Sequence, residues 1–281
     1  MTAAARAHHV TATDRWVVAL DIDGTVLTED GSLGEPTAAE ITRVASLGHE
    51  VMLATGRSVA MTLPVVDRLG ITPQYLVCAN GAIVMGRDPE APLGYAQVHV
   101  ETFDPREVLT TIRGFLEGAS YAVEDRDGIF RYTGSFPDGA LSGSNQRVEF
   151  DDLLAVDATR VVVISPDHAT EDFLSVVDRM GLHKVSYNVG WTAWLDIAPD
   201  GVNKATGLQY VTQRLGVPAS RTLTVGDGRN DIDMLEWTVA GGGIAVAMGQ
   251  APEEVAAVAS ERTGTDLDDG VAQTLARHFQ E

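Results

Sequence analysis

Short apolar runs alternate with amphipathic segments along the first part of the chain. The run Trp16–Ile22 predicts a buried strand that ends in acidic residues, and apolar residues at helical spacing predict a helix over Thr37–Leu47. A second and a third strand are expected over Glu50–Ala54 and Tyr75–Ala79. This β-α-β-α-β order predicts a parallel sheet covered by helices on both faces.

Turn-forming residues mark the connections between these elements. Ser58 is suited to cap the helix after the second strand, and Pro64 is expected to interrupt that helix. After the third strand, Asn80-Gly81 is a tight-turn signal that leads into a strand over Ala82–Met85. The chain is therefore expected to turn sharply directly after the third strand.

The pattern changes after residue 86. Helices are expected over Pro105–Leu116 and Thr170–Met180. Strand-like segments lie between and around them: Tyr95–Val100, Tyr121–Glu124, Ile129–Tyr132, Arg160–Ser165, Lys184–Asn188 and Trp191–Ile197. This mixture predicts a small α+β domain with a mostly antiparallel sheet.

The β/α alternation resumes near residue 203. The expected elements are a helix over Lys204–Leu215, a strand over Thr222–Val225, a helix over Asp231–Trp237, a strand over Gly243–Ala247, and helices over Glu253–Ala259 and Gly270–Phe279. We therefore predict an α/β fold with a Rossmann-like, doubly wound parallel-sheet core (16–86 and 196–281), an inserted α+β cap domain (87–195) and a flexible N-terminal tail (1–15). A length of 281 residues agrees with two domains.

Composition and charge narrow the function classes. The chain has 40 acidic and 20 basic residues, a net charge of -20, and this field repels nucleic acid and anionic membrane surfaces. No apolar run is long enough for a membrane span or a signal peptide. The single cysteine, Cys78, cannot form an internal disulfide, which predicts a buried core residue in a reducing cytoplasm. The sequence is compatible with a monomer and with a homodimer.

Two acidic residues follow the first predicted strand, in Asp21-Ile22-Asp23-Gly24-Thr25. Ligands of parallel sheets bind at the carboxyl ends of the strands, so both carboxylates are expected to face a crevice. One carboxylate can attack phosphorus to form an aspartyl-phosphate, and a second can protonate the leaving oxygen and later activate water. Gly24 allows the chain to turn away from the strand. The alternative is an acidic turn at a strand end, without catalytic function.

A second acidic segment, 226–231 (GDGRND), follows a later predicted strand. Asp227 and Asp231 could bind a hard cation together with Asp21. Mg²⁺ prefers such a site, with few carboxylates, several waters and phosphate oxygens. Asp231 could instead cap the helix that it precedes.

Thr55 and Lys204 could contact a phosphoryl group. The Thr55 hydroxyl lies at the end of the second strand, where it can donate to a phosphoryl oxygen. Lys204 opens a helix, and because a cation there opposes the helix dipole, its position favours a role outside the helix, such as neutralising a transferring phosphoryl group. An ordinary strand-end threonine and a solvated surface lysine are the alternatives.

In this order, the four segments resemble the motifs of the haloacid dehalogenase (HAD) superfamily. Asp21-x-Asp23-Gly-Thr resembles its first motif, Thr55 in Ala-Thr-Gly-Arg its second, Lys204 its third, and Gly-Asp227-x-x-Asn-Asp231 its fourth. The insertion between the second and third motifs, with segments 80–82 (NGA), 202–205 (VNKA) and 230–234 (NDIDM), is similar to the Cof-like sugar-phosphatase branch, subfamily IIB. One departure is the sequence NKA around Lys204, where many relatives have Ser or Asp before the lysine and Gly after it.

The resemblance implies a Mg²⁺-dependent phosphatase that hydrolyses a small phosphate ester, such as a sugar phosphate, through an aspartyl-phosphate. It implies Asp21, Asp23, Thr55 and Lys204 as catalytic residues, and Asp21, Asp23 (through its carbonyl), Asp227 and Asp231 as metal ligands. It further implies Gly24, Thr25, Arg57, Asn80, Gly81 and Asn230 as substrate- or phosphate-binding residues. The cap is expected to contact the leaving group, with Glu124, Arg126, Arg131, Tyr132, Tyr187, Asn188 and Trp191 as candidates that could equally have packing roles.

Two other functions are compatible with these motifs. A phosphomutase uses the same aspartyl-phosphate chemistry but returns the phosphoryl group to a sugar. A non-enzymatic phosphate-binding module similar to a receiver domain also combines Asp, Thr and Lys at strand ends, but such a domain is much shorter and lacks a large insertion. A phosphorylated ion pump is excluded by the missing transmembrane segment.

Overall fold

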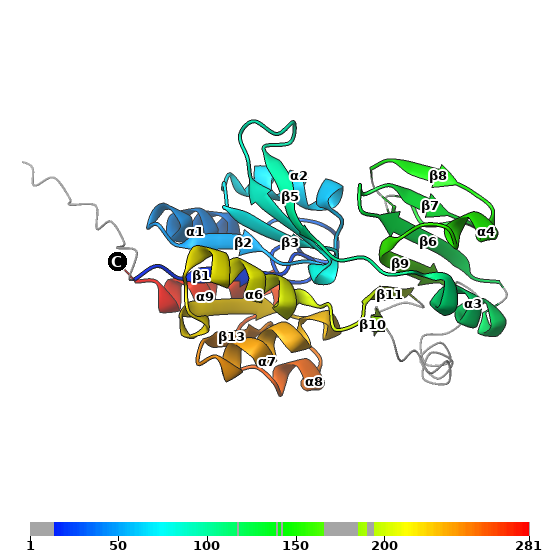
Figure 1. Ribbon diagram of the computed structural model, residues 1–281. Coiled ribbons are helices and arrows are strands. Elements are labelled where there is room, and N and C mark those ends of the chain that lie inside the picture. Colours follow the sequence, from blue (N-terminus) through cyan, green and yellow to red (C-terminus); the bar gives the residue numbers. More distant parts are fainter. Residues whose placement is uncertain are drawn as a thin grey trace, which may run out of the picture. The chain divides into compact units, whose positions relative to one another are not determined.

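The computed structural model describes residues 14–116, 118–138, 140–141, 143–165, 185–189 and 194–280. The chain divides into two compact units, of which the first comprises Met1–Leu53, Val66–Tyr75 and Gln209–Glu281, and the second Ala54–Val65 and Leu76–Leu208. Figure 1 shows the helices and strands, coloured along the sequence. The helix predicted over Thr170–Met180 and residues 1–13 of the predicted tail lie outside the described residues. The division into a core (16–86 and 196–281) and a cap (87–195) stays a prediction.

A five-stranded parallel sheet forms the centre of the first unit, with the strand order β14-β13-β12-β1-β2. The strands are β1 (Val17–Leu20), β2 (Glu50–Leu53), β12 (Thr222–Gly226), β13 (Ile244–Ala247) and β14 (Glu261–Arg262). From the central pair β1 and β12, the chain adds strands in opposite directions. Strand β2 lies beside β1, whereas β13 and β14 lie on the far side of β12. The carboxyl ends of β1 and β12 therefore flank the switch point at which open α/β sheets bind ligands.

In the described part of the first unit, four α-helices lie wholly within it: α1 (Glu35–Ser46), α7 (Ile232–Ala240), α8 (Glu253–Ala256) and α9 (Gly270–His278). Helix α1 packs against α9 and β2, whereas α7 packs against β12 and β13. The buried residues of α1, Thr37, Ile41 and Val44, repeat at helical spacing, as the sequence pattern predicts. The expectation of an α/β fold with a parallel-sheet core is confirmed.

The second unit contains a six-stranded, mostly antiparallel sheet with the order β10-β11-β9-β6-β7-β8. The strands are β6 (Ser120–Asp125), β7 (Phe130–Tyr132), β8 (Asn145–Arg147), β9 (Ala158–Ile164), β10 (Val185–Val189) and β11 (Trp194–Pro199), accompanied by helices α3 (Arg106–Phe115) and α4 (Phe150–Leu153). Val108, Leu109 and Ile112 of α3 form a core with Tyr121 and Val161 of the sheet. The predicted mixture of helices and antiparallel strands is therefore confirmed for the described part of this segment.

The third strand does not join the five-stranded sheet. Strand β3 (Tyr75–Cys78) lies in a separate three-stranded sheet with β4 (Ile83–Arg87) and β5 (Tyr95–Val100). A single parallel bridge, between Ala54 and Val77, continues the expected pairing. The β-α-β-α-β prediction therefore gives the correct order of elements but overestimates the length of this parallel ladder, because β2 ends at Leu53.

The prediction that Pro64 interrupts a helix is wrong. Helix α2 (Val59–Leu69) contains Pro64 and continues past it. The residues that follow, Val65, Val66 and Leu69, are buried. A proline removes one N–H donor from a helix, and here the burial of the apolar face outweighs that loss. Helix α2, like α6 (Lys204–Leu215), contributes residues to both units.

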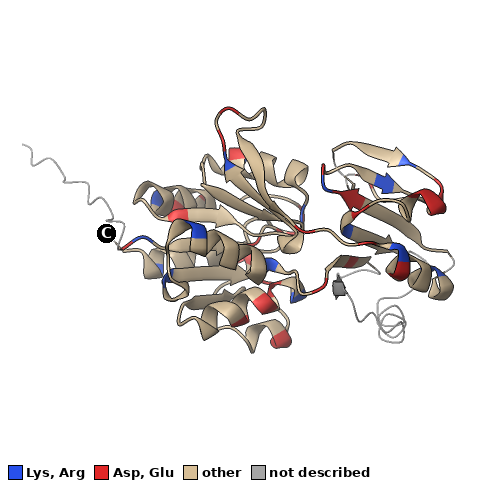
Figure 2. Ribbon diagram, viewed as in Figure 1, with Lys and Arg blue, Asp and Glu red and all other residues tan. Residues whose placement is uncertain are grey.

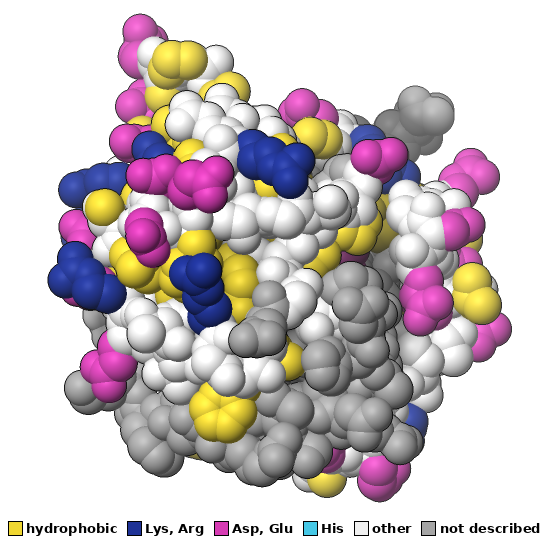
Figure 3. Space-filling view, turned by 90° about the vertical axis from the view of Figure 1, so that its right-hand side faces the viewer, with side chains coloured by type: hydrophobic (Ala, Val, Ile, Leu, Met, Phe, Trp, Pro, Cys, Tyr) yellow, Lys and Arg dark blue, Asp and Glu magenta, His cyan; other side chains and the backbone are white. Residues whose placement is uncertain are grey.

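Charged residues occur along both units, and acidic residues are spread among basic ones (Figures 2 and 3). Cys78 is a buried, free thiol, and burial raises its pKa to about 12, so packing explains it, as predicted. Among the described residues, no helix is both long and apolar enough to cross a membrane.

Candidate active site

Three carboxylates meet in the first unit at the switch point of the parallel sheet. Asp21 follows β1, Asp227 follows β12, and Asp231 ends the single turn η3 (Arg229–Asp231). One ligand oxygen from each lies within 4.8 Å of the other two, and all three residues are buried. We call this group the acidic centre. The structure thus brings together three of the four predicted metal ligands.

Backbone N–H groups hold the acidic centre in place. The Asp21 N–H donates to the Val225 carbonyl (3.0 Å), which extends the pairing of β1 and β12. The Asp231 Oδ2 accepts from the N–H groups of Asp227 (3.0 Å) and Gly228 (2.9 Å). Hydrogen bonds to a charged carboxylate stabilise it in a buried site. The predicted residue Thr25 also contributes, since its hydroxyl donates to the Asp227 Oδ1 (2.9 Å).

Two glycines provide the space that these carboxylates occupy. Gly24 has a φ of 72°, and a Cβ at this position would lie 2.4 Å from the Asp227 Oδ2. A Cβ at Gly226 would lie 2.3 Å from the Asp231 Cγ. Gly24 is therefore required for two reasons, the left-handed backbone and the close approach of Asp227.

Other residues lie at the edge of the acidic centre. Asp23, the predicted acid/base, has an exposed side chain, as a residue that exchanges protons with substrate and water requires, and Asn230 is partly exposed. Gln250, which no sequence motif indicates, donates from Nε2 to the Gly24 carbonyl (2.5 Å). The one signal for Gln250 is its position, because it comes shortly after β13 at the carboxyl edge of the sheet.

A second group of predicted residues lies together in the second unit. The Thr55 N–H donates to the Val77 carbonyl (2.9 Å), and the Asn80 N–H donates to the Thr55 carbonyl (3.0 Å). The Arg57 N–H donates to the Thr55 Oγ1 (3.1 Å). Thr55 is buried, and because its oxygen accepts from Arg57, the hydroxyl proton can still donate to a ligand. We call residues 55–57 the Thr55 loop.

The turn after β3 is strained and lies against the start of α6. Ala79, Asn80 and Gly81 have φ angles of 49°, 51° and 99°. Consecutive left-handed residues of this kind persist where the surroundings enforce them, often at functional sites. A Cβ at Gly81 would lie 2.0 Å from the Asn203 carbonyl oxygen, so the turn contacts the residue before Lys204. Lys204 is fully buried, which contradicts its alternative explanation as a solvated surface residue.

The donor set of the acidic centre suits a hard divalent cation. Three carboxylates supply oxygen ligands and negative charge, and His and Cys are absent from the cluster. Mg²⁺ prefers oxygen ligands, which carboxylates, waters and phosphates supply, whereas Zn²⁺ favours His and Cys. The residues therefore fit a magnesium site.

A further charged group lies in the second unit, on the sheet that contains β6, β9 and β11. Arg160 pairs with Glu124 (Nη2 to Oε2, 3.1 Å) and lies 3.7 Å from Asp196 (Nη1 to Oδ1). We call these three residues the ion cluster. Glu124, a predicted leaving-group contact, is fully buried and is the ion-pair partner of Arg160. Arg160 was not predicted, although an arginine inside an otherwise apolar strand is a recognisable signal.

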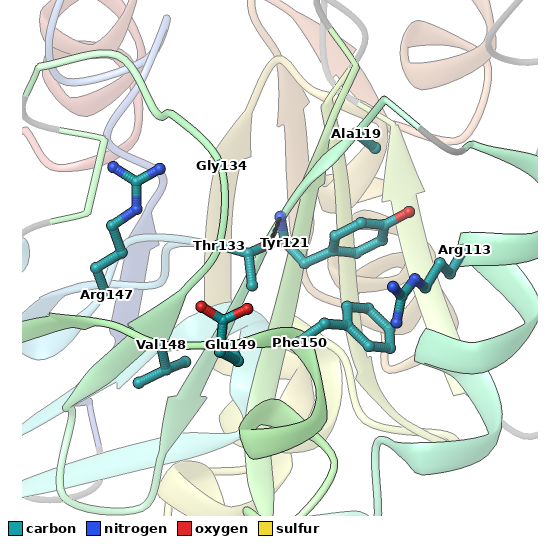
Figure 4. Close-up of a pocket in the computed structure, with 9 residues that line it drawn as sticks. All are labelled: Arg113, Ala119, Tyr121, Thr133, Gly134, Arg147, Val148, Glu149 and Phe150. Atoms are coloured by element: carbon teal, nitrogen blue, oxygen red, sulfur yellow. Dashed lines mark hydrogen bonds between the residues drawn. The ribbon is translucent and has the colours of Figure 1, made fainter.

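The other predicted leaving-group residues are less informative. Arg131 pairs with Asp125 (2.7 Å), and Trp191 and the side chains of Tyr187 and Asn188 lie outside the described residues. A pocket of about 260 Å³ opens in the second unit (Figure 4). Its lining residues are Arg113, Ala119, Tyr121, Thr133, Gly134, Arg147, Val148, Glu149 and Phe150. The pocket is thus formed by residues other than the predicted ones.

Comparisons with known proteins agree with this geometry. The sequence profile of haloacid dehalogenase-like hydrolases matches residues 18–275. The 5-amino-6-(5-phospho-D-ribitylamino)uracil phosphatase YitU of Bacillus subtilis is 29% identical over 95% of this chain and 98% of its own length. The pyridoxal phosphate phosphatase YbhA of Escherichia coli is 28% identical over 94% and 98%. A solved HAD subclass IIB sugar phosphatase has the same fold, with a TM-score of 0.78 and 20% identity over 94% and 98% of the two chains.

Proposed function

Since the chain belongs to the family of haloacid dehalogenase-like hydrolases and is a phosphatase, we propose that it hydrolyses a small phosphorylated metabolite through an aspartyl-phosphate on Asp21. The observation that supports this most directly is the acidic centre, which is buried at the switch point of the parallel sheet. In this proposal, Asp21 has two roles, as a nucleophile and as a metal ligand. The agreement of motif order, fold and geometry favours this chemistry over a phosphate-binding module.

Each step of the reaction has a candidate residue in this chain. Asp21 attacks phosphorus while Asp23 protonates the leaving oxygen, and Asp23 then takes a proton from the water that hydrolyses the aspartyl-phosphate. Thr55 and Lys204 donate hydrogen bonds to the phosphoryl oxygens, where negative charge accumulates in the transition state. Asp21, Asp227, Asp231 and the Asp23 carbonyl would hold Mg²⁺. When bound, Mg²⁺ neutralises phosphoryl charge.

The proposed substrate is a sugar phosphate, a polyol phosphate or a similar small phosphate monoester. We assign leaving-group recognition to residues 87–195, as a cap that closes over the substrate and excludes water. The two curated relatives act on a phosphoribityl pyrimidine and on pyridoxal phosphate, so both compounds belong in the first substrate panel. We further propose a cytoplasmic protein whose partners are small molecules, and neither nucleic acid nor membranes.

The test is phosphate release from a panel of sugar phosphates, the two compounds above and an aryl phosphate. Each is assayed with Mg²⁺ and with a chelator, for the wild type, Asp21→Asn and the control Asp67→Asn, whose side chain is exposed. We expect release that requires both Mg²⁺ and Asp21 and is unchanged in Asp67→Asn. Full activity in a folded Asp21→Asn variant would refute the mechanism. An isomerised sugar phosphate without free phosphate would indicate a phosphomutase.

A further inference from the structure

Arg160 forms a buried pair across two neighbouring strands of the second unit. Arg160 on β9 lies opposite Glu124 on β6 in the antiparallel register. The Arg160 Nε donates to the Glu124 Oε2 (3.1 Å), and the Nη2 lies 3.1 Å from the same oxygen. The side chains of Arg160 and Glu124 are 7% and 0% exposed. The guanidinium is therefore fixed in one orientation.

The other side of this guanidinium contacts the Thr55 loop. The Arg160 Nη1 donates to the Gly56 carbonyl (2.5 Å), a residue 104 positions earlier in the chain. The Arg160 Cζ lies 5.3 Å from the centroid of the Phe130 ring, which limits movement of the side chain further. A charge-assisted hydrogen bond thus joins the sheet to the loop that contains the proposed phosphate-binding hydroxyl.

The contacted carbonyl belongs to the same peptide group that orients the Thr55 hydroxyl. The Gly56 carbonyl and the Arg57 N–H are the two ends of one planar peptide. The Arg57 N–H donates to the Thr55 Oγ1 (3.1 Å). A hydrogen bond to the carbonyl fixes the plane of this peptide and polarises it, which makes its N–H a stronger donor. The Thr55 oxygen is then held by the N–H, and its own proton stays available to another acceptor.

Stability alone is a weak explanation for this arrangement. Replacing a buried ion pair by apolar residues is often neutral or stabilising. The Glu124 Oε1 is buried and accepts no hydrogen bond from any described residue, so the pair leaves part of its carboxylate unsatisfied. An unsatisfied buried oxygen destabilises a protein by about 1–3 kcal/mol. The ion cluster is therefore better explained by a function that needs the guanidinium in this place.

We propose that Arg160 is a positioning residue for catalysis, which acts through the Gly56–Arg57 peptide to orient the Thr55 hydroxyl toward the phosphoryl group. This inference rests on the proposed function, because it assumes that Thr55 donates to a phosphoryl oxygen. The order of hydrogen bonds is Arg160 to the Gly56 carbonyl, the Arg57 N–H to Thr55, and Thr55 to the phosphoryl oxygen. Glu124 holds Arg160 in place, and neither residue touches the substrate.

The test is a double-mutant cycle of Arg160→Lys and Thr55→Val in the Mg²⁺-loaded enzyme, with an aryl phosphate as substrate. Lysine keeps the charge beside Glu124 but lacks the planar fork that reaches Glu124 and Gly56 together. We expect kcat to fall about 100-fold in Thr55→Val, as for the removal of a preorganised donor. Arg160→Lys should lower kcat about tenfold, through misorientation of that donor, and should leave KM within about twofold.

The decisive result is the double variant. If Arg160 acts through Thr55, Arg160→Lys should lower kcat no further in the Thr55→Val background. Three results would each overturn the inference. Arg160→Lys could lower kcat by the same factor with and without Thr55→Val, or it could change KM and leave kcat unchanged. The third is a Thr55→Val variant with the kcat of the wild type. If Arg160→Lys does not fold, the apolar pair Arg160→Met with Glu124→Leu replaces it in the cycle. Failure of the proposed function has a different result: the wild type would release no phosphate, or Asp21→Asn would release as much as the wild type.

Discussion

The acidic centre of the first unit and the ion cluster of the second unit both bury carboxylates, but they stabilise them differently. In the acidic centre, Asp231 accepts from two backbone N–H groups and Asp227 accepts from the Thr25 hydroxyl. In the ion cluster, the guanidinium of Arg160 lies between Glu124 and Asp196. Backbone N–H groups and a hydroxyl therefore hold the carboxylates of the first group, whereas the guanidinium of an arginine pairs with those of the second.

This difference indicates what each group can bind. Three buried carboxylates with fixed oxygens are suited to bind an external cation, and binding of that cation would stabilise the protein. The ion cluster carries its own cation, and the remaining hydrogen-bonding capacity of Arg160 is directed at the Gly56 carbonyl. The first group is therefore suited to hold a metal ion, and the second to hold a loop.

Removal of Asp227 should have the largest effect on the acidic centre. We expect Asp227→Asn to lower kcat/KM on the order of 10⁴-fold, about 5 kcal/mol, because metal and phosphoryl charge stabilisation are both lost. The variant should also lose the rise in melting temperature that Mg²⁺ gives the wild type. The control is Asp233→Asn, the same change two positions after Asp231 on an exposed side chain, and it should behave as the wild type. Mg²⁺-dependent stabilisation that survives in Asp227→Asn would show that the cation binds elsewhere.

Removal of the cation from the ion cluster should also lower the stability of the protein. Arg160→Met leaves the buried Glu124 carboxylate uncompensated, and we expect the free energy of unfolding to fall by about 3–5 kcal/mol. The double variant Arg160→Met with Glu124→Leu should recover most of this loss, because both charges are then absent. Urea denaturation measures both values. A double variant as unstable as Arg160→Met would mean that the guanidinium stabilises the fold through other contacts.

The acidic centre was predictable from the sequence because its residues lie at strand ends. Asp21 and Asp227 directly follow apolar runs, and parallel strands place their carboxyl ends at one edge of a sheet. The pairing of β1 with β12 needs no knowledge of the intervening 200-odd residues, only the expectation that both strands belong to one sheet. The chemistry of this site is thus a consequence of strand order and residue type.

The ion cluster was not predictable in the same way. Its members come from β6, β9 and β11, and their contacts depend on the register of antiparallel strands, which the hydrophobic pattern of short strands does not fix. The continuation of helix α2 past Pro64 also depends on tertiary contacts, because the burial of Val65 and Val66 stabilises it. Gln250 reaches Gly24 through a loop, whose path has no periodic signal. Tertiary contacts of this kind are invisible to local patterns.

The glycine that accommodates Asp227 provides a test of geometry within the acidic centre. Gly24→Ala places a Cβ 2.4 Å from the Asp227 Oδ2, and we expect kcat to fall about 100-fold because a ligand is displaced by about 1 Å. Gly31→Ala is a matched control, since Gly31 also has a positive φ (80°) but its Cβ meets nothing within 4 Å. The control should lose about 1 kcal/mol of stability from backbone strain and keep its activity. Equal activity losses in both variants would attribute the effect to strain alone.

The pH dependence of stability should give the smallest effect and reports on the ion cluster. Burial raises the pKa of Glu124, although Arg160 lowers it in part, so the folded protein retains a proton that the unfolded chain releases. The free energy of unfolding should therefore fall as the pH rises from about 4.5, by up to about 1.4 kcal/mol per pH unit, until the folded-state pKa is passed. Burial also raises the pKa values of Asp196 and Glu50, so part of the pH dependence of stability remains when Glu124 is removed.

The substitution Glu124→Gln should reduce the slope of stability against pH, whereas Glu236→Gln, on an exposed residue, should not. Identical slopes in wild type and Glu124→Gln would mean that Arg160 keeps the Glu124 carboxylate charged throughout this pH range, and would contradict the expected retention of a proton.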